Sequence, residues 1–184
     1  MNVRENPQPE NERSFKSKEE EAAAWERLRS LRGRHYLEES IEFYRKALVT
    51  VALREGRDLS DYSRACLRAI DRDIEEDAGR VLKRGSIEST SNTLWTMYHM
   101  LGSYFGTVIV EKLGGHWRTP NIIRYWQSRF LWNPSFLFDY WYVELNGHNI
   151  PVFKIVRWRC DGSGRVKSLA EVYERIASGR SWRD

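Results

Sequence analysis

The sequence is short of the residues that build most metal and cofactor sites. Its two cysteines, Cys66 and Cys160, are too few for a disulfide scaffold or a cysteine-rich zinc cluster. None of its four histidines stands at a metal-ligand spacing from another histidine, a cysteine or a carboxylate. We therefore expect no metal and no other cofactor. His99 falls on an apolar helical pattern and is predicted to be a satisfied, buried histidine.

Signatures of enzymes are also missing. The chain has no G-x-S-x-G elbow and no cysteine in a recognisable catalytic setting. The glycine-rich residues 161–164 lack the lysine of a phosphate-binding loop, so we interpret them as a connector. The five acids between Asp71 and Asp77 point around much of a helix, which favours a solvated face over a cation site. We therefore predict a protein that is not an enzyme.

Long apolar runs are absent as well. Residues 89–110 carry no charge, but the apolar part begins only at Leu94 and polar residues interrupt it. A membrane span needs about 20 predominantly apolar residues. The first thirty residues are polar and contain no apolar segment of the kind that secretion signals have. These absences predict a cytoplasmic protein that does not cross a membrane.

What the sequence does contain is a helical first half. Its 184 residues are enough for one domain with a sizeable core. Residues 1–17 are polar and aperiodic, so we expect a disordered arm followed by a single domain over residues 18–180. A capping box that starts at Ser17 predicts a first helix. Apolar spacing from Leu37 to Val51 predicts a second helix that ends near Gly56, and Ser60 is a candidate cap for a third.

The central residues, 93–117, predict a long buried helix. Their apolar side chains recur at steps of three and four, which places them on one helical face. Gly102 and Gly106 lie within that helix, where each glycine costs about 1 kcal/mol relative to alanine. We therefore expect another element to approach the bare backbone at these glycines. Gly114 has the place of a left-handed cap, and Trp117 follows in an expected strand.

Strands and turns are predicted after the central helix. Aromatic and β-branched runs predict strands over residues 122–126 and 136–145, with a turn at residues 133–134 between them. Asn146 and Gly147 follow directly. Because this pair tolerates positive φ angles, it predicts a tight hairpin.

Residues 150–159 fit two structures. A strand would continue the hairpin, although Pro151 removes a ladder donor, whereas a helix could be capped by Asn149. We choose the helix. A capping box at Ser168 and a break at Gly179 bound a final amphipathic helix. The whole pattern predicts an α+β fold, in which an N-terminal helical layer packs on a small, mostly antiparallel sheet and two short C-terminal helices follow.

The central helix and the strand after it carry the pattern LGxYxG…GGxW, which comprises Leu101, Gly102, Tyr104, Gly106, Gly114, Gly115 and Trp117. This pattern resembles that of uncharacterised bacterial families, some of them found among toxin-immunity-like proteins. The chain departs from those families at Thr107, where they often carry an acidic residue. The resemblance implies non-catalytic binding of another protein, as immunity-like or adaptor proteins perform it.

Cations and aromatic residues alternate in two stretches of the second half. The candidate binding surface that they form comprises Arg124, Trp126, Arg129, Trp132, Arg157 and Trp158. Tryptophan and arginine are enriched at protein interfaces, but arginine with flat rings is also what a binder of single-stranded nucleic acid needs. From residue 116 onward, eleven Lys or Arg stand against six Asp or Glu. Because this excess is small for a dedicated nucleic-acid binder, we predict a protein partner and keep nucleic acid as the alternative.

Overall fold

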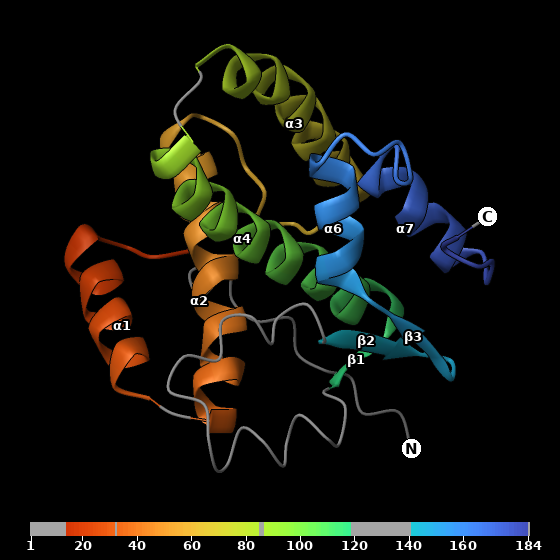
Figure 1. Ribbon diagram of the computed structural model, residues 1–184. Coiled ribbons are helices and arrows are strands. Elements are labelled where there is room, and N and C mark those ends of the chain that lie inside the picture. Colours follow the sequence, from red (N-terminus) through yellow and green to blue (C-terminus); the bar gives the residue numbers. More distant parts are fainter. Residues whose placement is uncertain (1–13, 32, 85–86, 119–140, 184) are drawn as a thin grey trace, which may run out of the picture.

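The computed structural model describes residues 14–31, 33–84, 87–118 and 141–183 (Figure 1). The helices that precede the sheet are α1 (Lys18–Ser30), α2 (Gly33–Arg54), α3 (Arg64–Arg84) and α4 (Ile87–Leu113). The strands β1 (His116–Arg118), β2 (Tyr142–Leu145) and β3 (His148–Ile150) and the helices α6 (Val152–Cys160) and α7 (Leu169–Ala177) follow. This order confirms the predicted α+β fold.

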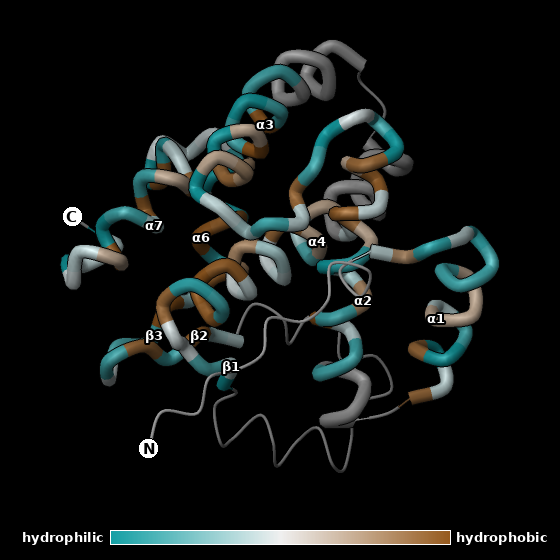
Figure 2. Tube along the Cα trace, turned by 180° about the vertical axis from the view of Figure 1, so that it is seen from behind, coloured by the Kyte–Doolittle hydropathy of each residue, from teal (hydrophilic) through white to brown (hydrophobic). Residues whose placement is uncertain are grey.

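Helix α4 is the centre of the molecule. It packs along α2 on one side and against α6, α7 and the sheet on the other. The predicted apolar face is buried, with Tyr104, Phe105, Val108 and Ile109 fully enclosed. Figure 2 shows hydrophobic residues gathered where α4, α6 and the sheet meet. Among the described residues, no helix is long and apolar enough to span a bilayer.

Two aromatic rings lie against the glycines of α4. A Cβ atom at Gly102 would lie 2.3 Å from Cδ1 of Phe153 on α6, and one at Gly106 would lie 2.1 Å from Cη2 of Trp117 on β1. Both distances are far below van der Waals contact, so only glycine leaves room for these rings. This confirms the expected close approach of other elements to the backbone of α4, and the groups that approach are the rings of Phe153 and Trp117. Gly114, with φ of +76°, ends the helix as predicted.

The sheet has the order β1-β2-β3 and is antiparallel throughout. Trp117 pairs with Val143, and Val143 pairs with Ile150, so one row of residues crosses all three strands. Asn146 and Gly147 have φ of +51° and +77°, which is the predicted tight hairpin. Of the strand predicted over residues 136–145, the structure describes the last part, which forms β2. The predicted strand at 122–126 and turn at 133–134 lie outside the described residues.

The chain is already packed before α1 begins. Phe15 is buried, its N–H donates to Oγ1 of Thr50 at 2.9 Å, and its ring lies 5.5 Å from that of Phe43. The prediction of a disordered arm through residue 17 is therefore wrong at Phe15, because a single aromatic residue in a polar segment finds an apolar site on α2. Residues 1–13 lie outside the described part of the chain.

Two helix starts differ from the prediction. Ser63, and not Ser60, accepts from the amide of Cys66 at the start of α3, since the buried Tyr62 precedes the helix with φ of +51°. Helix α6 is present as predicted, but Pro151 is its N-cap and makes no side-chain capping bond. Asn149 is paired in β3 and cannot cap it.

Candidate functional site

The structure describes two of the six residues of the predicted binding surface. Arg157 and Trp158 lie on α6, where Arg157 is exposed and Trp158 is half-buried. The other four residues lie outside the described part of the chain and are Arg124, Trp126, Arg129 and Trp132.

Trp158 is the centre of a cluster that the sequence did not reveal as a unit. The ring of Trp182 lies 5.7 Å from it at an interplanar angle of 33°. Nζ of Lys154 and Cζ of Arg165 lie 4.9 Å and 5.2 Å from its centroid, and Arg183 lies 4.9 Å from that of Trp182. These are cation–π distances. We call these five residues the Trp–cation cluster.

Three local features bring the cluster together. The inner face of α6 is buried, which turns Lys154 and Trp158, four residues apart, toward the outside. The connector at residues 161–164 then reverses the chain, with positive φ at both of its glycines, and returns Arg165 to Trp158. A third glycine, Gly179 with φ of +73°, ends α7, and Trp182 beyond it contacts Trp158 of α6.

The cluster is positively charged and its cations are available. Within the described residues, no ion pair with a carboxylate engages Lys154, Arg165 or Arg183. Residues 152–183 carry eight Lys or Arg against three Asp or Glu. Three cations of the predicted basic C-terminal part therefore lie over a pair of partly exposed tryptophan rings.

Arg159 lies one residue after Trp158 but has a different role. It donates from Nε to Oδ1 of Asp71 at 2.8 Å and also pairs with Glu75. Asp71 in turn accepts from Oγ of Ser168 at 2.7 Å and from the first amides of α7. The prediction that the acids of residues 71–77 form a solvated face is wrong for Asp71, which is buried because it caps α7 from α3.

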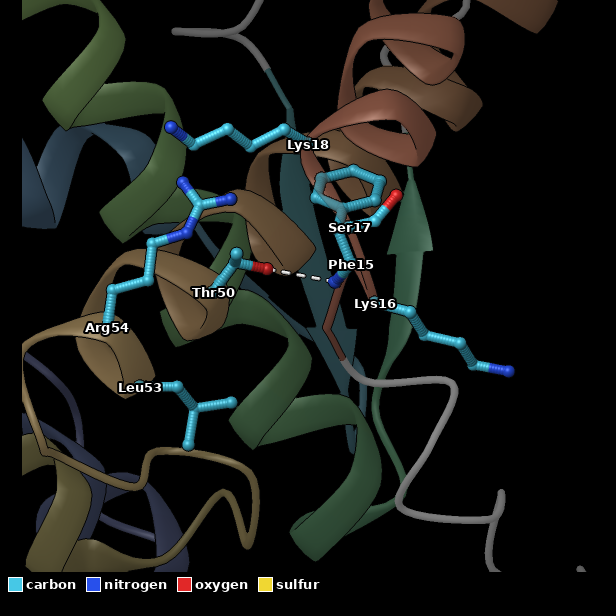
Figure 3. A pocket seen from close by; sticks show the side chains of 7 residues that line it. All are labelled: Phe15, Lys16, Ser17, Lys18, Thr50, Leu53 and Arg54. Atoms are coloured by element: carbon cyan, nitrogen blue, oxygen red, sulfur yellow. Dashed lines mark hydrogen bonds between the residues drawn. The ribbon is translucent and has the colours of Figure 1, made fainter.

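A second candidate is a pocket of about 410 Å³ between the start of α1 and the end of α2 (Figure 3). Its wall offers three cations, but Arg54 pairs with Glu21 at 2.9 Å. The first turn of α1 also carries three glutamates, which offset the three positive charges. Figure 3 shows Lys16 pointing away from the other two cations. The pocket therefore has no strong preference for an anion. Its lining residues are Phe15, Lys16, Ser17, Lys18, Thr50, Leu53 and Arg54.

Burial holds His99, Cys66 and Cys160 in their neutral forms. Burial lowers the pKa of His99 to about 4, and the ring lies between Tyr44 and Phe153 at 5.1 Å and 6.4 Å. Burial, with a further contribution from Asp61, raises the pKa of the Cys66 thiol. Burial raises the pKa of Cys160 to about 12. Both thiols are therefore protonated near neutral pH, where thiolates are the reactive form. Among the described residues, no group of three or more His, Cys, Asp or Glu side chains is placed so that it could hold a metal ion.

Comparison with protein-family models, with curated proteins and with solved structures finds no match for this chain. The role of the Trp–cation cluster therefore has to be inferred from the chemistry of its own residues. The cluster offers flat apolar surface and positive charge on an ordered scaffold.

Proposed function

We propose that this protein is a non-catalytic domain that binds another protein through the Trp–cation cluster. The observation that supports the proposal is the pairing of two partly exposed tryptophan rings with three cations that no described carboxylate engages. The resemblance to immunity-like families remains a prediction, and it leads to the same kind of function.

The energetics of interfaces explain why such a cluster suits a protein partner. A few aromatic and arginine side chains carry most of the binding free energy, and truncating one of them costs about 2 kcal/mol or more. The ring of Trp158 supplies apolar area at small entropic cost, and the cations over it supply charge complementarity. Because α6 is buried along its inner face, the helix that carries Lys154 and Trp158 needs little rearrangement to bind.

Nucleic acid is the alternative, and the small number of cations at the ring disfavours it. A base needs an open ring face on which to stack. At Trp158, three groups already lie within about 6 Å of the ring centre: Lys154, Arg165 and Trp182. Any incoming ring must displace Trp182, so stacking alone does not separate the two functions. The two cations at this one ring are few beside the six to ten phosphate contacts of a dedicated nucleic-acid binder.

The test compares three immobilised baits: the wild-type protein, Trp158→Ala and the control Trp25→Ala, which removes an exposed tryptophan from α1. We expect one protein from the source cells to be retained by the wild type and the control and lost with Trp158→Ala. That protein is then purified and titrated against the same three baits. An affinity that changes by less than about threefold in Trp158→Ala, less than 1 kcal/mol, would contradict the proposal.

A further inference from the structure

We infer that Trp182 occupies the place of a partner residue, and that binding exchanges it for an aromatic side chain flanked by carboxylates. The inference rests on the proposed function, because it concerns the same Trp–cation cluster and names the chemistry of the partner.

The attachment of Trp182 to the rest of the protein is slight. Helix α7 is closed by the N–H of Arg180, which donates to the carbonyl of Arg175 at 2.8 Å. Beyond Arg180, the N–H of Arg183 donates to Oγ of Ser181, a bond within the tail itself. Among the described residues, residues 181–183 make no hydrogen bond to α6 or α7. Apolar contact, chiefly the ring pair with Trp158, holds the tail in place.

Such a contact is easily exchanged. The free energy of one aromatic pair corresponds to a factor of about 2 to 12 in a binding constant. When a partner places its own ring on Trp158, the new aromatic pair restores the free energy that is lost when Trp182 leaves. Residues 181–183 therefore act as an internal competitor that weakens the affinity for a partner by a factor of about 2 to 12.

The partner's charge follows from the cations that remain on α6 and the connector. Lys154 and Arg165 lie over the ring of Trp158, on residues that do not belong to the tail. When Trp182 leaves, these two cations flank the opened ring. Carboxylates on either side of an incoming aromatic residue reach both cations, so an acidic segment with one aromatic residue fits the site in shape and in charge.

The probe is a short fluorescent peptide with glutamates on both sides of one phenylalanine, titrated by anisotropy. We expect the affinity of Trp182→Ala to exceed that of the wild type by about 2- to 12-fold, because the competitor is gone. Trp158→Ala should lose binding, and the control Trp25→Ala should match the wild type. A peptide with alanine in place of phenylalanine should bind the wild type and Trp182→Ala equally.

The outcomes separate the inference from the proposed function. If Trp182→Ala binds more weakly than the wild type, Trp182 is part of the anchor and the exchange is overturned, while the protein interface stands. If the acidic peptide binds no variant, or a lysine counterpart binds equally well, the acidic partner is overturned. If the peptide binds Trp158→Ala as tightly as the wild type, the cluster is not the interface and the proposed function fails with the inference. Circular dichroism confirms that each variant is folded.

Discussion

Helices α1 and α7, at the two ends of the described chain, are attached to the core in different ways. α1 has 13 residues and buries one of them, Leu28. α7 is shorter, with nine residues, yet it buries four and has its first amides bound by Asp71 of α3. α1 packs mainly on α2, aided by ion pairs at the surface, and stands at the outer edge of the molecule in Figure 1.

This difference shows which exposed aromatic residues belong to an ordered surface. Trp25 on α1 is 40% exposed, but the helix that carries it depends on few buried contacts. Trp158 stands on a scaffold that a buried ion pair and a capped helix hold in place. Binding sites on rigid elements are more precise than sites on loosely held ones. We therefore locate the interface at the C-terminal end.

The largest effect is expected when the anchor of α7 is removed. Asp71→Ala leaves Arg159, whose side chain is 10% exposed, without its buried partner and leaves the amides of α7 unbound. Breaking a buried pair on one side costs about 3–5 kcal/mol. Urea unfolding should show a loss of this size.

The control for this change is Asp73→Ala on the same helix, which removes a surface ion pair with Arg57. We expect a loss of about 1 kcal/mol or less. Equal losses in the two variants would show that the contacts of Asp71 hold α7 no more firmly than a surface ion pair would.

The next effect is a dependence of stability on pH, which we expect from His99 of α4 at the contact between α2 and α6. His99 of α4 contacts Tyr44 of α2 and Phe153 of α6. Its pKa is lowered to about 4 from an ordinary value of about 6.5, so the unfolded chain takes up the proton first as pH falls. Stability is then complete above pH ~6.5, and about 3 kcal/mol is lost as pH falls to about 4. Thermal unfolding of His99→Gln should lack this additional loss, and parallel pH profiles would contradict the assignment.

A smaller effect is expected where the sheet meets α4. Gly106→Ala places a methyl group on the ring of Trp117 and should cost about 1–3 kcal/mol through overpacking. Glu111→Ala, an exposed change on the same helix, should cost less than about 0.5 kcal/mol. In a Trp117→Leu background the cost of Gly106→Ala should shrink. An undiminished cost would mean that the ring does not cause it.

The smallest effect on global stability is expected at α1. Truncating a buried leucine ordinarily costs about 2–5 kcal/mol. If α1 undocks on its own, Leu28→Ala can cost no more than the free energy of docking, which we expect to be about 1 kcal/mol. Hydrogen exchange should then show lost protection in α1 and retained protection in α7. A loss of about 2–5 kcal/mol, with faster hydrogen exchange throughout the molecule, would show that α1 and α7 are attached to the core equally firmly.

Local signals accounted for much of the fold. The capping serine at residue 168, the glycine at 114 and the Asn-Gly hairpin lie where the sequence predicts them, because each depends on near neighbours in the chain. The burial of Phe15 and of Asp71 escaped prediction, since both depend on contacts with residues far away in sequence. Lys154, Arg165, Trp182 and Arg183 escaped for the same reason, although spacing of four between Lys154 and Trp158 was a visible signal.

The most direct test of the central claim asks whether the Trp–cation cluster serves a protein or a nucleic acid. Labelled single- and double-stranded oligonucleotides are titrated with the wild type and with Trp158→Ala at about 50 mM and 200 mM salt, an interval over which six to ten phosphate contacts cost about 10³ to 10⁵ in affinity. We predict no binding at micromolar protein even at the lower salt. Micromolar or tighter binding that collapses across the interval, and that Trp158→Ala removes, would contradict the assignment of the cluster to a protein partner.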